Sequence, residues 1–215
     1  MTQNIRYSVD GDGIALLLID VAGRPMNVLT PGFQSDLAEC IQRVATDAAV
    51  RGVVIGSAKS SFMAGADIKD MVGAYDRGIT AAEASKFSYE LSSLLRRFET
   101  CGKPVAAAIN GVALGGGFEV ALACHYRVIA DEPKAGVGLP EVKIGLLPGG
   151  GGTQRVPRLV GVTEALKLIT EGRQLSPADA LKKGLVHEVA PTAEIVERAR
   201  QWILKGGEGV QPWDK

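Results

Sequence analysis

Continuous apolar runs of strand length are the feature that most constrains the fold of this chain. Residues 14–19 read IALLLI, and similar runs lie at 53–55 and 105–109, while residues 127–130 and 185–189 are predicted as further short strands. Neighbouring residues of a strand point to opposite faces, so a strand without polar positions has to be covered on both faces of its sheet. The runs therefore predict a parallel sheet that is covered on both sides.

Helical patterns separate the apolar runs. Residues 31–49 carry apolar side chains at steps of four, four and three, from Phe33 to Val44, which is the spacing of one helix face. The segment 176–183 begins with a serine suited to the N-cap, followed by a proline at the first helical position. Further helices are predicted at 80–99, 119–124, 163–170 and 193–204.

Strands that alternate with helices indicate an α/β domain. We expect residues 1–190 to form the catalytic core of this domain, and residues 191–215 to add a terminal helix and a linker. Nothing in the tail would close a domain, so we expect the chain to be part of a longer protein.

Composition excludes several classes of function. The 215 residues include 24 Lys and Arg and 24 Asp and Glu, so the formal net charge is zero and nucleic acid is not an expected partner. No apolar run approaches the length of a membrane span. Three scattered cysteines and only two histidines argue against disulfides and metal centres and favour a cytoplasmic location.

A glycine run that leads into a glutamate is the strongest indication of chemistry. The apolar run ending at Ile109 leads into Gly115-Gly116-Gly117, and Glu119 follows in a helix-like stretch. Glycines leave N–H groups free at a helix start, where they can stabilise an oxyanion, and a carboxylate beside them can transfer protons. The alternative is a packing turn between a strand and a helix, which the run alone leaves open.

A second segment, residues 62–71, follows the run at 53–55 and contains several small residues. A ligand could lie against its backbone, with the N–H group of Ala66 as a donor. The alternative is an ordinary loop between a strand and a helix, with Asp67 as an acid in the first turn.

Two further segments follow the glycine run. Glu141 lies among apolar neighbours at 138–145, where burial would raise its pKa and make it a usable acid, although a surface glutamate is the alternative. The glycines at 149–152 lack the ending of a phosphate-binding loop and are expected mainly to shape the backbone next to Glu141. Cys124 is expected to be a small core residue, because no histidine supports it as a nucleophile.

In this order and spacing, the four segments resemble the crotonase (enoyl-CoA hydratase/isomerase) superfamily over residues 14–189. Residues 124–128, 138–141 and 211–214 are most similar to hydratase domains of multifunctional fatty-acid β-oxidation α-subunits. The resemblance implies an α/β crotonase (ClpP-like) fold, a spiral of ββα units that forms two roughly perpendicular sheets surrounded by helices.

The resemblance also implies roles for four residues. The N–H groups of Ala66 and Gly116 would form an oxyanion hole for the thioester carbonyl of an acyl-CoA. Glu119 would polarise the water that attacks C3 of a trans-2-enoyl thioester, and Glu141 would exchange the proton at C2. The product would be a 3-hydroxyacyl-CoA.

The same resemblance implies the binding of an acyl-CoA thioester along these segments. The implied substrate-binding residues are Met26, Ala64, Asp67, Ile68, Lys69, Gly115, Pro140 and Gly149. No metal or cofactor is implied for this domain, since CoA is part of the substrate and NAD would belong to a dehydrogenase portion outside this chain. The implied protein partners are further copies of the chain and, for a full-length protein, a thiolase β-subunit.

The expected function is therefore that of an enoyl-CoA hydratase in fatty-acid β-oxidation, with 3-enoyl to 2-enoyl isomerase activity as an addition. One alternative is another crotonase-type enzyme, either an isomerase alone or a thioester hydrolase. The other alternative is a non-catalytic acyl-CoA-binding fragment.

Overall fold

The predicted apolar runs lie next to one another in a six-stranded sheet with the order β1-β2-β3-β4-β6-β8. All neighbouring strands are parallel except β1 and β2. In this computed structural model, which describes residues 3–215, the strands are β1 Ile5–Val9, β2 Ile14–Ile19, β3 Gly52–Ser57, β4 Val105–Ile109, β6 Tyr126–Ala130 and β8 Glu188–Ala190. A second sheet pairs β5 Val112–Leu114 with β7 Gly136–Gly138 in parallel. The α/β prediction is confirmed.

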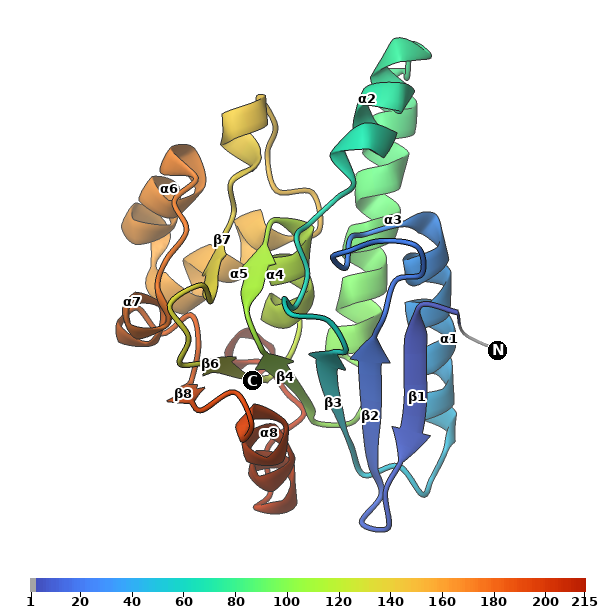
Figure 1. Cartoon of the computed structure of the whole chain (residues 1–215), viewed down its shortest axis with the longest axis vertical. Helices are drawn as coiled ribbons and strands as arrows, with labels where there is room; N and C mark the ends of the chain where they lie inside the picture. The colour runs from blue at the N-terminus through green and yellow to red at the C-terminus, as the bar shows by residue number, and fades with distance from the viewer. Residues whose placement is uncertain (1–2) are drawn as a thin grey trace.

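Helices surround the two sheets (Figure 1). They are α1 Pro31–Thr46, α2 Ile68–Asp76, α3 Ala81–Glu99, α4 Gly116–Leu122, α5 Gly152–Val160, α6 Val162–Glu171, α7 Pro177–Lys182 and α8 Ile195–Leu204, with short 3-10 turns η1 Glu141–Ile144 and η2 Pro212–Asp214. In Figure 1, α2 and η1 form separate projections at the same end of the molecule. Within residues 3–215, no helix combines the length and the apolar character needed to cross a membrane.

The inner strands β3, β4 and β6 of the six-stranded sheet are buried on both faces. Along β4, Ala107 and Ile109 belong to the larger core, which also contains the buried faces of α1, α3 and α4. The alternate residues Ala106 and Ala108 belong to a second core with Ile203 of α8. The period-2 geometry of a strand therefore divides one apolar run between two cores.

Several elements differ from the sequence-based prediction, among them β1, the run at 185–189 and α5. The antiparallel edge strand β1 was not predicted, because its burial pattern has one buried residue among five. The run at 185–189 was predicted as strand, yet Leu185 and Val186 donate their N–H groups to Ala180 O and close the end of α7. Pairing with β6 begins only at β8. The helix α5 was also missed, because it starts inside a glycine run and contains Pro157.

The tail, residues 206–215, was expected to be a linker but packs against the domain. Gln211 is fully buried, and its Nε2 donates to Cys124 O at 3.2 Å. Asp214 accepts two hydrogen bonds of 2.8 Å from the guanidinium of Arg96 on α3. The expectation failed because these contacts are polar and specific and leave no apolar periodicity in the sequence.

The start of α4 is packed against backbone so closely that it has room only for glycine. A methyl group on Gly117 would lie 2.3 Å from Met63 O, whereas one on Gly11 would meet no atom within 4 Å. Gly117→Ala is therefore expected to lower the free energy of unfolding by about 1–3 kcal/mol. Gly11→Ala, the matched control, should change it by less than about 0.5 kcal/mol. Urea denaturation measures both, and equal stability of the two variants would contradict this packing.

Candidate active site

Glu119 is a buried carboxylate held between two helices. It lies in the first turn of α4, is 1% exposed, and its Oε1 accepts hydrogen bonds from Gly150 N at 2.8 Å and Gly152 N at 2.7 Å. The first N–H groups of a helix have no partner within it and carry partial positive charge, so the start of α5 is suited to hold an anion. The donor glycines lie more than thirty residues further along the chain.

Glu141, at the start of η1, lies against the backbone that leads into α4. A methyl group on Gly115 would lie 2.9 Å from Glu141 Oε1, so the carboxylate rests against the backbone just before α4. Its other oxygen, Oε2, is buried and has no hydrogen-bond partner among the described residues. Gly115 has φ 53 and ψ −130, a conformation that favours glycine. The absence of a side chain at this position allows the second carboxylate to reach the site.

The two carboxylates are held in environments that favour the protonated form. Burial, with a smaller contribution from the charge of Glu119, raises the pKa of Glu141 to about 7, while a hydrogen bond from its own backbone N–H acts against the rise. Burial also raises the pKa of Glu119, while the N–H groups of Gly152 and Gly150 and the charge of Arg155 act against that rise. Because the two groups interact, their titration belongs to the pair. The expectation that apolar neighbours would raise the pKa of Glu141 is confirmed.

Two backbone N–H groups lie close to these carboxylates. A methyl group on Gly65 would lie 3.7 Å from Gly116 N, so the backbone leading to Ala66 lies beside the start of α4. Among residues 3–215, neither Ala66 N–H nor Gly116 N–H has a hydrogen-bond acceptor. Two free donors from separate segments are the arrangement that can stabilise an oxyanion.

A buried amide holds the loops around Ala66 in place. Asn27 is fully buried; its Oδ1 accepts from Val21 N at 2.9 Å, and its Nδ2 donates to Phe62 O at 3.1 Å. The Asn27 carbonyl accepts from Ala64 N at 2.9 Å. The sequence offered no signal for this residue, because a single asparagine after a turn is usually exposed.

The remaining predicted substrate-binding residues lie along these loops. Met26 and Ile68 are large apolar side chains that are 46% and 60% exposed. Asp67 is engaged in the structure, since its carboxylate caps α2 by accepting from Lys69 N and pairs with Arg24 at 2.7 Å. This capping contact agrees with the alternative that residues 62–71 form a loop between a strand and a helix, with Asp67 at the helix start. Pro140 precedes Glu141 at the start of η1.

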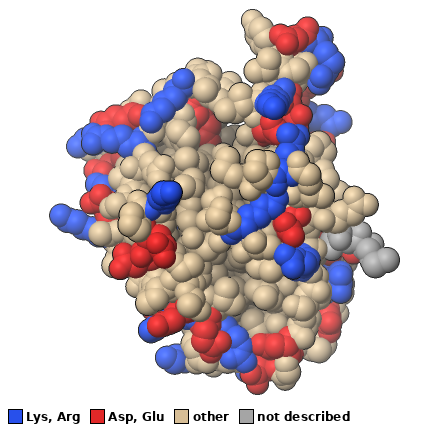
Figure 2. All heavy atoms as spheres, in the orientation of Figure 1, with Lys and Arg blue, Asp and Glu red and all other residues tan. Residues whose placement is uncertain are grey.

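The surface around this end of the molecule carries both signs of charge. Figure 2 shows Lys and Arg interspersed with Asp and Glu and separated by uncharged surface, as zero net charge predicts. Exposed apolar side chains occur on α2, at Val72 and Tyr75, and around η1, at Ile144 and Leu147. The projections seen in Figure 1 therefore present apolar surface.

The glycines at 149–152 serve a different carboxylate from the one expected. The sequence suggested that they shape the backbone next to Glu141, but Gly150 and Gly152 donate to Glu119. A methyl group on Gly150 would lie 2.7 Å from Glu119 Oε2. Gly149 lies against Ser88 of α3, where a methyl group would be 3.0 Å from the hydroxyl oxygen. A glycine run alone cannot indicate which carboxylate it will contact.

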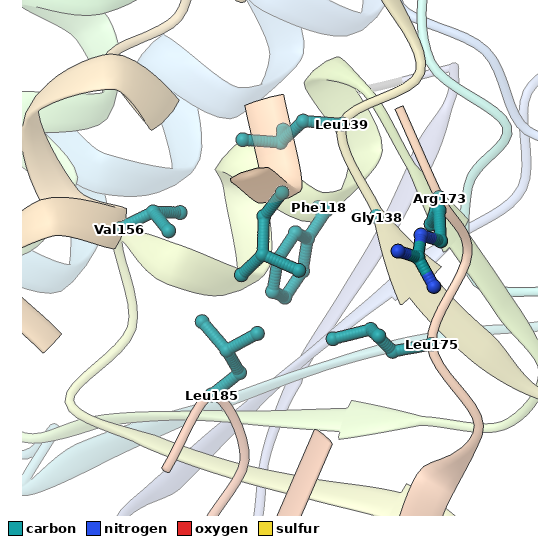
Figure 3. Close-up of a pocket in the computed structure, with 8 residues that line it drawn as sticks. Phe118, Gly138, Leu139, Val156, Arg173, Leu175 and Leu185 are labelled. Atoms are coloured by element: carbon teal, nitrogen blue, oxygen red, sulfur yellow. The ribbon is translucent and has the colours of Figure 1, made fainter. Parts of the chain in front are cut away.

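A small apolar cavity lies next to this site and is separate from it. Figure 3 shows Phe118, Val156, Leu175 and Leu185 around it, and neither carboxylate lines it. Leu139 also lines the cavity, and its Cδ1 would lie 2.9 Å from a methyl group on Gly152. This apolar packing supports the loop that donates to Glu119.

The histidines and Cys124 have structural roles. His125 Nδ1 accepts from Val105 N at 2.9 Å and its Nε2 donates to Glu99 O at 3.0 Å. Burial lowers the pKa of His125, and lowers that of His187 to about 4, so both rings are neutral at pH 7. Burial raises the pKa of the Cys124 thiol to about 12, which confirms it as a core residue.

Comparison with known proteins reveals extensive similarity. A family model described as "Enoyl-CoA hydratase/isomerase" matches residues 12–208. Fatty acid oxidation complex subunit alpha of Shewanella sp. (strain ANA-3) is 44% identical over 205 residues, which cover 95% of this chain and 28% of that protein. The same protein of Shewanella halifaxensis (strain HAW-EB4) is 46% identical over 207 residues, 96% of this chain and 29% of the relative. The chain thus spans less than a third of the length of these relatives.

Solved structures of shorter enzymes are also similar. An enoyl-CoA hydratase from Bacillus anthracis has a TM-score of 0.85 at 33% identity, covering 94% of this chain and 76% of that one. One from Geobacillus kaustophilus HTA426 has a TM-score of 0.86 at 32% identity, covering 95% and 75%. These neighbours confirm the fold that the sequence resemblance implied.

The raised pKa of Glu141 implies that its charge destabilises the fold. A glutamate in the unfolded chain releases its proton near pH 4.5, whereas Glu141 in the folded state releases it near pH 7. Between these two pH values the folded state binds more protons than the unfolded state, so the free energy of unfolding falls as the pH rises. Glu141→Gln removes this effect. It is expected to raise the free energy of unfolding by about 1–3 kcal/mol at pH 8, with no gain near pH 4.5. Urea denaturation at the two pH values checks this, and a gain that does not depend on pH would contradict it.

Proposed function

The chain belongs to the enoyl-CoA hydratase/isomerase family, and from this membership we propose that it adds water to 2-enoyl-CoA thioesters in fatty-acid β-oxidation. One observation carries the proposal: two buried or half-buried carboxylates of raised pKa meet beside two free backbone N–H groups. Relatives named as fatty acid oxidation complex subunit alpha and as enoyl-CoA hydratase support it.

The free N–H groups of Ala66 and Gly116 bind the thioester carbonyl oxygen of the substrate. When water adds at C3, negative charge builds on this oxygen as an enolate forms. Fixed donors stabilise that charge without having to reorganise during the reaction, and donors of this kind can contribute several kcal/mol to lowering the barrier.

The two carboxylates divide the proton transfers between them. Glu119, whose charged form is stabilised by the N–H groups of Gly150 and Gly152, polarises the attacking water and accepts the proton that the water loses. Glu141, whose pKa burial raises to about 7, supplies the proton that adds at C2. The water gives its hydroxyl to C3 and its proton to Glu119, Glu141 gives a proton to C2, and return of the proton from Glu119 to Glu141 restores the site. The oxygen–C3 and hydrogen–C2 bonds thus replace the double bond, and the product is a 3-hydroxyacyl-CoA.

Substrate binding follows from the loops that surround these groups. Met26, Asp67, Ile68 and Lys69 lie on segments beside Ala66 and would contact CoA. The acyl thioester would pass the backbone at Ala64, Gly115, Pro140 and Gly149. The name of the relatives, subunit alpha of a complex, supports association with other chains; a second copy and a thiolase subunit are the proposed partners, in the cytoplasm.

A second activity, the shift of a 3-enoyl double bond to the 2 position, is favoured by the same pair. A carboxylate that removes a proton next to the thioester and returns it two carbons away needs only the oxyanion donors and one acid of pKa near 7. Product analysis with 3-enoyl thioesters measures this activity separately from hydration.

Replacing either carboxylate by its amide tests the hydratase proposal. Glu119→Gln and Glu141→Gln are each expected to reduce kcat for crotonyl-CoA by about 10²–10⁴-fold, because each removes one proton transfer. Loss of enoyl absorbance measures turnover, and calorimetry with CoA measures binding, which both variants should retain.

Near wild-type turnover in both variants would contradict the mechanism. Wild-type protein that binds CoA but does not hydrate crotonyl-CoA would favour the non-catalytic alternative, and hydrolysis of the thioester would favour the hydrolase alternative.

A further inference from the structure

A buried ion pair next to the active site takes no part in the proton transfers. Glu99 at the end of α3 and Arg155 on α5 are 2% and 5% exposed. Arg155 Nε donates to Glu99 Oε1 and Arg155 Nη2 donates to Glu99 Oε2, both at 3.0 Å. This two-bond geometry fixes the guanidinium plane as well as its position.

The third nitrogen of Arg155 reaches the loop that holds Glu119. Arg155 Nη1 donates to Gly150 O at 3.1 Å, and Gly150 N donates to Glu119 Oε1 at 2.8 Å. The peptide units around Gly150 thus connect the guanidinium to the carboxylate. Contact is close along the loop, since a methyl group on Gly151, which has φ +103, would lie 2.4 Å from Arg155 Nη1.

A contribution to the stability of the fold does not by itself explain why this buried ion pair is present. Removing two charges from water costs several kcal/mol per ion, and well-packed apolar residues often replace such pairs without loss of stability. What apolar residues cannot provide is a donor to Gly150 O or a positive charge near Glu119. That charge acts against the rise in the pKa of Glu119 that burial causes.

We infer that Arg155 is a positioning residue for Glu119, which holds the Gly150 loop so that its N–H groups remain aimed at the carboxylate. The inference rests on the proposed function. Glu99 orients Arg155, and Glu99 in turn accepts from Arg96 Nη1 at 2.8 Å. Arg96 also binds Asp214 in the tail, so a continuous chain of charged groups runs from the tail to the active site.

Two variants of Arg155 separate its charge from its geometry. Arg155→Met should lower kcat for crotonyl-CoA by about 10²-fold with KM near the wild-type value, because Glu119 is displaced. The pKa of Glu119 should rise, because the carboxylate loses a neighbouring positive charge. The acid limb of the plot of kcat against pH should therefore move to higher pH. Arg155→Lys retains the charge, so its acid limb should stay near the wild-type position while kcat remains reduced.

The control is Arg158→Met on the same helix; within residues 3–215, the Arg158 side chain donates hydrogen bonds only to Gln154 of α5. It should leave kcat and the acid limb unchanged. The charged groups that face Glu119 are Arg155 from α5 and Glu141 from η1. The strands β4 and β5, which pack against α4, contribute none.

Glu99→Gln provides a second measurement if loss of Arg155 prevents folding. Without the negative charge of Glu99, the positive charge of Arg155 acts more strongly on Glu119 and should lower its pKa. The acid limb of the plot of kcat against pH should then move to lower pH, opposite to the shift in Arg155→Met. Carbon NMR of the Glu119 carboxyl in a Glu141→Gln background follows the same pKa changes without turnover, so the inference is tested even if hydration is absent.

Opposite shifts of the Glu119 titration in Arg155→Met and Glu99→Gln are the expected result. A titration of Glu119 that stays at its wild-type position in folded Arg155→Met or Glu99→Gln would overturn the inference. A fall in kcat with an unmoved acid limb in Arg155→Met would also overturn it, because it would leave only a structural role.

Discussion

The hydrogen bonds from Gly150 and Gly152 to Glu119 are the interaction on which the site depends. A carboxylate that is 1% exposed can be ionised only where donors replace the water it has lost. These donors lie at the start of α5, and their acceptor lies in the first turn of α4, so the two bonds join the two helices. The same bonds stabilise the charged form of Glu119. The position of Glu141, the two free N–H groups and the Arg155 contact are all arranged around this carboxylate.

Glycine makes such an arrangement sterically possible. The start of α4 lies against the Met63 backbone and Glu141, and the loop before α5 lies against Glu119 itself. Side chains at these positions would separate the carboxylates from the N–H groups that stabilise negative charge. The inner strands of the six-stranded sheet, buried on both faces, supply the rigid frame that keeps these backbones in contact.

Residues whose roles follow from local pattern could be predicted from the sequence. The strands β2 and β4 have the predicted bounds, because their apolar runs are uninterrupted, and Ser176 caps α7 as its Ser-Pro start indicates. The four site segments were recognised by their order along the chain. Long-range polar contacts were missed: Asn27, Arg155 and Gln211 look like ordinary surface residues until the fold buries them. The same reason explains why the glycines at 149–152 were assigned to the wrong carboxylate.

Glu119 and Glu141 titrate as a coupled pair, in which burial and the charge of Glu119 raise the pKa of Glu141. Carbon NMR of labelled glutamate side chains measures this directly in the wild type and in Glu119→Gln. The structure predicts a pKa of about 7 for Glu141 in the wild type. It predicts a lower value in Glu119→Gln, because one of the two causes that raise the pKa is removed while burial remains. An ordinary glutamate pKa for Glu141 in both proteins would contradict the account.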